Sequence, residues 1–190
     1  VLLVFAAACG SSKTSAPPSP SAPREVLLPD LSRMDASVQA QVKQRHATLM
    51  EKRKAGASGD ELGTAYGEYG MLLHAAEYHE AAEPAYLNAQ DLMPGDVRWP
   101  YYLGHLYKSI GQTQKSIDAF TQALDRSPSE IAALVWLGRL YLEQGKPDEA
   151  EKFFTRAADL PPRNVAVLSG LGQAALAKRD YPKAVSVLEE

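Results

Sequence analysis

Histidines are the residues of this chain best suited to zinc binding or to proton transfer near neutral pH. The sequence has four of them, at His46, His74, His79 and His105. His74 and His79 are five residues apart, which does not place them on one helical face, whereas helical zinc pairs stand three or four apart and need a third ligand. No Ser/His/Asp set or pair of carboxylates converges in the sequence. We therefore expect no catalytic residues, no metal site and no cofactor.

Two glycine-containing stretches could suggest phosphate binding. Gly63, Gly67 and Gly70 form a glycine-rich run, but no predicted strand precedes it, and a phosphate loop needs a strand–loop–helix context. The second stretch, 145–147, is Gly-Lys-Pro and lacks the Ser or Thr that follows the lysine in a phosphate loop. Both stretches are predicted to be parts of helices or turns.

Composition narrows the function classes further. The 190 residues carry a net charge of −3, with acidic and basic residues interspersed, and no basic stripe indicates nucleic-acid binding. The single cysteine, Cys9, excludes an internal disulfide framework and any multi-cysteine metal site. A hydrophobic content of 45% is sufficient for a continuous core.

A period of 34 residues organises most of the chain. Glycines recur at this spacing within apolar helical stretches, as Gly70, Gly104, Gly138 and Gly172. Prolines recur in the same frame, as Pro94, Pro128 and Pro162. A fixed period of this length is typical of helical solenoids.

Each repeat is predicted to contain two amphipathic helices. In the second repeat, Leu103, Leu106, Tyr107 and Ile110 follow the i, i+3, i+4, i+7 pattern of a buried face. Gly111 follows, where a helix C-terminus favours a residue that can adopt positive φ. The recurring glycines lie inside helices, where each costs about 1 kcal/mol relative to alanine, so we expect them to allow close packing of a neighbouring helix.

The residues in this frame resemble the tetratricopeptide repeat family over residues 63–190. Position eight of each repeat is glycine, position twenty is Ala or Ser, and position twenty-four is Tyr, Phe or Leu. The repeats are 63–96, 97–130, 131–164 and a shorter fourth, 165–190. The resemblance implies an all-α fold, a right-handed superhelix of antiparallel helix pairs, with a concave groove lined by the first helices.

The resemblance also implies which residues line the groove, because positions two, five, nine, twelve and thirteen of each repeat face it. The densest polar and aromatic group at these positions gives the predicted site, which is Arg98, Tyr101, His105, Lys108, Arg139 and Glu143. Basic groups beside an aromatic ring suit a peptide of acidic character; the alternative is a solvated face without a dedicated ligand. The carboxylate clamp of chaperone-binding members is not expected, because its positions hold Gly67 and Met71.

Both tryptophans are interpreted as packing residues rather than as platforms for a ligand. They are Trp99, early in the second repeat, and Trp136, in the third.

The N-terminal residues have the features of an export signal. Residues 1–8 are apolar and end in three alanines before Cys9, which resembles the lipobox of bacterial lipoproteins, in which the cysteine is lipidated. Ala6 departs from the usual leucine of that motif. Cleavage after Ala8 and a wrongly assigned start with no processing are the alternatives.

Residues 10–33 are predicted to be a Pro/Ser-rich linker that spaces an anchor from the folded repeats. Residues 34–57 are predicted to form a lead-in helix with an apolar stripe that includes Val38, Val42 and Leu49. Its expected role is to cap the first repeat; the alternative is a partner-binding segment.

Taken together, these features predict a non-catalytic scaffold or adaptor that binds a protein or peptide in its concave groove. We expect it to be exported and anchored to a bacterial envelope membrane through Cys9. The alternative is the regulatory N-terminal region of a larger enzyme or cytochrome-like protein that continues past residue 190.

Overall fold

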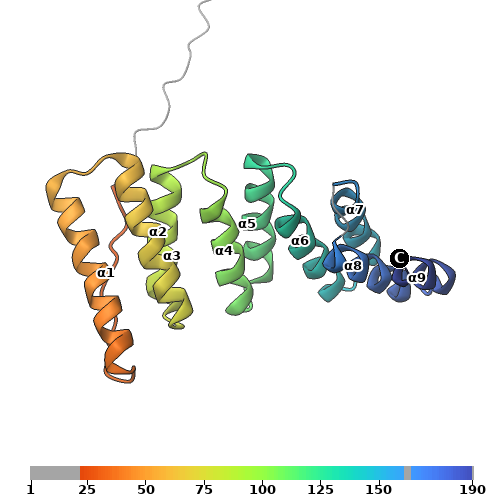
Figure 1. The fold of residues 1–190 in the computed structure, drawn as a ribbon, viewed down its shortest axis with the longest axis horizontal. Coiled ribbons are helices and arrows are strands. Elements are labelled where there is room, and N and C mark those ends of the chain that lie inside the picture. Colours follow the sequence, from red (N-terminus) through yellow and green to blue (C-terminus); the bar gives the residue numbers. More distant parts are fainter. Residues whose placement is uncertain (1–21, 161–163, 190) are drawn as a thin grey trace, which may run out of the picture.

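The computed structural model describes residues 22–160 and 164–189, and within them the regular structure is entirely helical. The helices are α1 (Ala36–Ala55), α2 (Gly59–Ala75), α3 (His79–Leu92), α4 (Arg98–Ser109), α5 (Thr113–Arg126), α6 (Ile131–Glu143), α7 (Pro147–Ala158), α8 (Val165–Ala177) and α9 (Tyr181–Leu188). Figure 1 shows them stacked in one row, with α1 at one end and α9 at the other.

Helices α2 to α9 form four pairs, one for each predicted repeat. The two helices of a pair pack against each other, and each second helix packs against the first helix of the next pair. Helix α1 packs against the outer side of α2. The all-α solenoid of helix pairs that the 34-residue period predicts is therefore confirmed.

The recurring glycines mark the closest contact within each pair. A β-carbon on Gly70, Gly104 or Gly138 would lie within 3.0 Å of an aromatic ring sixteen residues later. These rings belong to Tyr86, Phe120 and Phe154, each at most 1% exposed. The expected packing reason for the glycines is thus a ring from the second helix that occupies the space a side chain would need.

Each first helix ends in a Schellman motif with a left-handed residue at the same repeat position. The left-handed residues are Glu77, Gly111, Gly145 and Arg179, with φ between 61° and 73°. In the first repeat, the Tyr78 N–H donates to the Leu73 carbonyl at 2.9 Å and the Glu77 N–H donates to the His74 carbonyl at 3.0 Å. Gly111 is in the conformation expected from the sequence, whereas Glu77 and Arg179 adopt it although they carry side chains.

The end of the predicted linker differs from expectation, because residues 22–33 pack on the repeats as an extended segment, which we call the strap. Val26 and Leu31 of the strap are buried in the core around α1 to α4. The buried Asn88 side chain of α3 accepts a hydrogen bond from the Arg24 N–H and donates one to the Arg24 carbonyl, both at 2.8 Å. Figure 1 shows the strap running beside α1.

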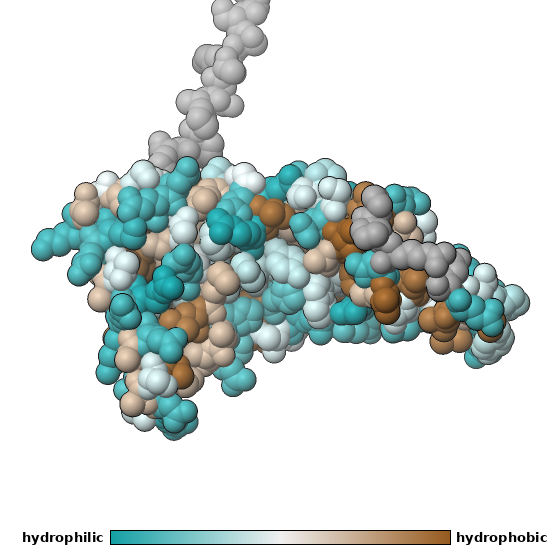
Figure 2. Space-filling model, viewed as in Figure 1, coloured by the Kyte–Doolittle hydropathy of each residue, from teal (hydrophilic) through white to brown (hydrophobic). Residues whose placement is uncertain are grey.

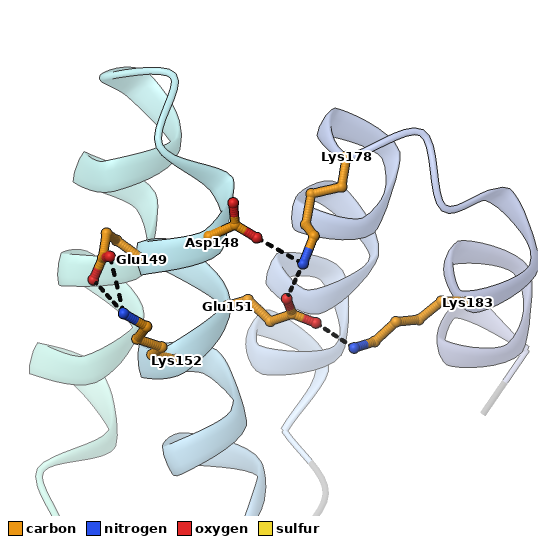
Figure 3. A network of polar contacts seen from close by, with 6 residues as sticks. All are labelled: Asp148, Glu149, Glu151, Lys152, Lys178 and Lys183. Atoms are coloured by element: carbon orange, nitrogen blue, oxygen red, sulfur yellow. Dashed lines mark hydrogen bonds and ion pairs between the residues drawn. The ribbon is translucent and has the colours of Figure 1, made fainter.

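The last pair of helices is linked to α7 by an ionic network. Glu151 of α7 pairs with Lys178, which follows α8, at 2.6 Å and with Lys183 of α9, and Asp148 also pairs with Lys178 at 2.8 Å. Figure 3 shows the two lysines converging on Glu151 from two sides. The network crosses from the third repeat to the turn that follows α8 and to α9.

Apolar side chains remain exposed on α8 and α9. Tyr181, Val185 and Leu188 of α9 are each more than half exposed. Figure 2 shows hydrophobic surface gathered at this end of the row.

Candidate functional site

A groove of about 610 Å³ lies between the first helices of the first two repeats. Three helices supply its lining residues. These are Met71, His74 and Ala75 from α2, Tyr86 from α3, and Tyr101, Tyr102, His105, Lys108 and Ser109 from α4. Those from α2 occupy repeat positions nine, twelve and thirteen, and most of those from α4 occupy positions five, nine, twelve and thirteen. The 34-residue frame therefore brings equivalent positions of neighbouring first helices to one surface.

Three residues of the predicted site, Tyr101, His105 and Lys108, line this groove. The rings of Tyr101 and His105 meet edge to face, with centroids 4.7 Å apart, and both rings also meet Phe120 of α5. The spacing of four residues on α4 places Tyr101 and His105 one helical turn apart, which allows this contact. The groove wall is thus aromatic, with a histidine inserted among the rings.

The His105 imidazole is neutral at physiological pH. Burial among these rings lowers its pKa to about 4, with smaller contributions in the same direction from His74 and Lys108. A neutral imidazole has one N–H donor and one ring nitrogen acceptor. His105 therefore offers a ligand hydrogen bonds and a ring face rather than a positive charge.

Lys108 joins the groove to the third repeat. Its ammonium pairs with Glu143 of α6 at 3.3 Å and lies 5.5 Å from the centre of the Trp136 ring. The Arg139 guanidinium lies over the same ring at 5.0 Å. The structure therefore groups Lys108, Arg139 and Glu143 around Trp136.

The two tryptophans pack as expected, but Trp136 has a further role. Trp99 is fully buried in α4, and its ring occupies the space that a side chain on Gly67 would need. Trp136 stacks on Phe120 with the rings 6.2 Å apart, yet it stays half-buried and also contacts His105 at 4.8 Å. Trp136 thus packs against the core and also contacts the groove wall through His105.

Arg98 is separate from the other predicted site residues. Its guanidinium donates to both carboxylate oxygens of Asp96, at 2.6 to 3.0 Å, and lies 4.5 Å from the centre of the Trp99 ring. The hydrogen bonds from Arg98 lower the pKa of Asp96. Arg98 does not line the groove, and its guanidinium is engaged at the start of α4.

Some lining residues were outside the predicted site. Met71 and His74 occupy the same repeat positions as His105 and Lys108, so the repeat frame already placed them on the groove, although the predicted site did not include them. Tyr86 has no such signal, because its repeat position predicts a core residue. Its hydroxyl lies 3.4 Å from His74 Nδ1 at the groove floor, and burial raises the pKa of Tyr86.

Helix α1 extends this surface. A neighbouring hollow of about 520 Å³ lies between α1 and α2 and shares Met71 with the groove. Gln41, Gln44 and Arg45 of α1 line it, and Arg45 pairs with Glu68 at 2.5 Å. The lead-in helix therefore covers α2 and also adds polar side chains beside the groove.

The described residues contain neither a metal-binding cluster nor a membrane-spanning helix. Among the residues that the structure describes, no group of three or more His, Cys, Asp or Glu side chains is placed to hold a metal ion. Across the same residues, no helix combines the length and apolar character needed to span a membrane.

Comparisons with known proteins agree with the repeat frame. Two family models, both described as tetratricopeptide repeat, match residues 101–165 and 142–190. No curated protein matches the sequence.

Similar solved structures include a tetratricopeptide repeat protein from Parabacteroides merdae, with 15% identity, a TM-score of 0.66 and coverage of 82% of this chain and 65% of that one. BtubC (BKLC) from P. vanneervenii has 16% identity and a TM-score of 0.69, over 84% of this chain and 74% of that one. MamA from Desulfovibrio magneticus RS-1, residues 41 to the end, has 16% identity and a TM-score of 0.61, over 78% of this chain and 91% of that one. These likenesses show the fold, and the chain spans less than two thirds of the Parabacteroides protein.

Proposed function

Because this chain is a tetratricopeptide repeat protein, we propose that it is a non-catalytic scaffold or adaptor that binds a protein or peptide partner in the groove between α2 and α4. Tetratricopeptide repeat domains in general bind protein partners. The observation that carries the proposal is the convergence of Tyr101, His105 and Lys108 on that groove.

The chemistry of the groove favours a partner segment with both aromatic or apolar and acidic side chains. The aromatic wall offers ring faces and edges. Lys108 and Arg139 sit over Trp136, where they can meet a carboxylate while their stems cover the ring. Glu143 already pairs with Lys108, so an acidic partner residue would compete with it for that ammonium.

The test is quantitative affinity capture from envelope extracts with the purified chain as bait. The variant Lys108→Ala/Arg139→Ala removes the two cations, and Tyr101→Ala removes an aromatic edge. Partners of the groove should be recovered at least tenfold less with either variant, which corresponds to about 1.4 kcal/mol or more of binding free energy.

The matched control is Arg33→Ala/Lys152→Ala, which removes the same charge from exposed positions outside the groove. Circular dichroism should show unchanged helix content for all variants. Recovery that stays unchanged in the groove variants, or falls equally in the control, would contradict the groove assignment.

We also propose that the protein is exported and held at a bacterial envelope membrane by lipid on Cys9. The support is the apolar run before Cys9, its lipobox-like alanines and the Pro/Ser-rich segment that follows. Cys9 lies outside the residues that the structure describes. Mass spectrometry of the mature N-terminus, expressed from the complete reading frame, should find a diacylglyceryl adduct on Cys9 that is lost in Cys9→Ser. An unmodified Cys9, including one left at the N-terminus by cleavage after Ala8, would refute the anchor.

A further inference from the structure

A second surface hollow, distinct from the groove, lies where the strap meets the turn between α2 and α3. It has a volume of about 660 Å³, and we call it the strap hollow. Its apolar wall includes Leu27 and Leu28 of the strap, Pro84 of α3 and Ile110 at the end of α4. Leu27 is 63% exposed and Leu28 is 39% exposed. These leucines face solvent, although the buried Val26 beside them shows that the strap can turn apolar side chains inward.

The strap is held firmly enough to form a permanent wall. Besides the two Asn88 hydrogen bonds to Arg24, the Tyr78 hydroxyl donates to the Asp30 carbonyl at 2.7 Å, and the Tyr69 hydroxyl donates to the Leu27 carbonyl at 3.4 Å. These bonds hold the strap backbone at both ends and in the middle. The position of Leu27 and Leu28 is therefore set by the fold of the first repeat.

Acidic side chains surround the apolar wall. Glu25 of the strap, Glu77 of the turn and Glu80 of α3 all line the strap hollow and are exposed. In residues 22–160 and 164–189, none of the three forms an ion pair, whereas the neighbouring cations are engaged: Arg24 with Asp91 and Lys115 with Glu83. The strap hollow therefore presents uncompensated negative charge next to exposed leucines.

The turn between α2 and α3 fixes the position of Glu77. Glu77 adopts φ = 63° at the repeat position where the later repeats have Gly111, Gly145 and Arg179, all of them left-handed. The Schellman motif at the end of α2 requires this conformation. In the first repeat it places a carboxylate at the rim of the strap hollow.

We propose that the strap hollow is a second docking site, which binds a partner segment carrying a large apolar side chain flanked by lysine or arginine. The apolar side chain covers Leu27 and Leu28, and the basic side chains pair with Glu77 and Glu80. Desolvation of the leucines supplies the affinity, and the carboxylates select against acidic segments. Lys108 lines the groove and Arg139 lies beside it over Trp136, so the two surfaces select partners of opposite charge.

This inference does not rest on the function proposed for the groove. The two surfaces share no lining residue, and the ring of His74 in the groove meets the ring of His79 in the strap hollow with centroids 5.5 Å apart. A variant in one surface can therefore be read separately from a variant in the other.

The probe is a fluorescein-labelled peptide, Gly-Lys-Leu-Lys-Leu-Arg-Lys-Gly, titrated with the chain and monitored by anisotropy at 50 and 150 mM salt. Two comparison peptides replace every basic residue by glutamate, or both leucines by serine. The first peptide should bind at least tenfold more tightly than either comparison, and NMR shifts should concentrate on residues 25–29 and 77–84. Glu77→Gln/Glu80→Gln and Leu27→Ser should each weaken binding roughly tenfold.

The charge-matched control is Glu51→Gln/Asp125→Asn, which neutralises two exposed carboxylates that do not line the strap hollow. It should leave the affinity within twofold. Equal loss in this control, equal binding of the glutamate peptide, or shifts centred on Tyr101 and His105 would overturn the proposal. The chain could also self-associate, and Glu77→Gln/Glu80→Gln could abolish that self-association. This result would overturn the proposal, because a second copy of the chain would then be the occupant of the strap hollow.

Discussion

A β-carbon on Gly104 of α4 would lie 2.7 Å from the ring of Phe120 in α5. This contact repeats as Gly70 with Tyr86 and Gly138 with Phe154. The ring of each second helix thus fills the space left open on its first helix, and the pairing sets how closely the two helices of a repeat approach.

Gly104→Ala should therefore destabilise the chain despite the higher helix propensity of alanine. The propensity gain is about 1 kcal/mol, whereas overpacking a filled core costs about 1–3 kcal/mol. Phe120 is fully buried, and the rings of Tyr101, His105 and Trp136 pack around it. We expect a net loss of up to about 2 kcal/mol in the free energy of unfolding, measured by urea denaturation.

Two controls accompany this prediction. Gly95→Ala adds a methyl group with no atom within 4 Å and should be neutral. The double variant Gly104→Ala/Phe120→Leu should recover part of the loss, because the smaller side chain relieves the clash. Gly104→Ala as stable as the wild type would show that the ring does not require the glycine.

The left-handed positions give a prediction of opposite sign. Glu77→Gly and Arg179→Gly should each raise the free energy of unfolding by about 0.5–1 kcal/mol, because glycine adopts positive φ without steric cost but loses more entropy on folding. Glu77→Ala removes the charge and keeps the β-carbon, so it should match the wild type. If the glycine variants are no more stable than their alanine counterparts, the strain assigned to these turns is absent.

The helix pairs could be predicted because the repeat residues act locally. Gly104 and Phe120 lie sixteen residues apart in adjacent helices, and the four copies of the pattern reinforce one another. The strap could not be predicted in this way. Its attachment depends on Asn88, 64 residues after Arg24, and a Pro/Ser-rich composition contains no signal for such a long-range contact.

The groove was predictable for the same reason as the helix pairs, since positions that face it recur with the period. Tyr101, His105 and Lys108 line it as the frame implies. Arg98 does not, because a short-range contact with Asp96 two residues earlier engages its guanidinium. Repeat position determines which way a backbone position faces, but the local partner of a long side chain decides where its charge lies.

The strap should detach when its backbone partner is removed. Asn88 is 2% exposed and is the side chain that bonds to both the N–H and the carbonyl of Arg24. Asn88→Ala should cost about 1–3 kcal/mol of unfolding free energy and speed hydrogen exchange over residues 24–28. Arg24→Ala loses only an exposed ion pair with Asp91 and should cost under about 1 kcal/mol. Equal effects of the two variants would show that the ion pair, not Asn88, holds the strap.

The network at Glu151 should hold α9 in a salt-dependent way. Hydrogen bonds from Lys178 and Lys183 lower the pKa of Glu151, so its contribution is present above the unfolded pKa and is lost as pH falls through the folded value. Glu151→Gln should speed hydrogen exchange over residues 181–188 in low salt and leave α2 unchanged. Added salt should reduce the difference between variant and wild type. A difference that persists in 1 M salt would point to packing rather than charge.

His105 should make stability depend on pH between about 4 and 6.5. Its folded pKa is about 4 because burial disfavours the imidazolium, whereas an unfolded histidine titrates near its ordinary value of about 6.5. Between these values the unfolded chain binds more protons than the folded chain, so the free energy of unfolding rises with pH and levels off above about 7. Because the ring is partly exposed, solvent screening reduces this contribution. We expect His105 to raise the free energy of unfolding by roughly 1 kcal/mol between pH 5 and pH 7. Urea denaturation at these two pH values should show that His105→Phe loses the pH dependence contributed by His105. The pH dependence contributed by His74, whose pKa is also lowered, should remain in this variant. Carboxylates such as Glu151 contribute mainly below pH 5, so an unchanged difference in His105→Phe would refute a neutral, half-buried histidine in the groove wall.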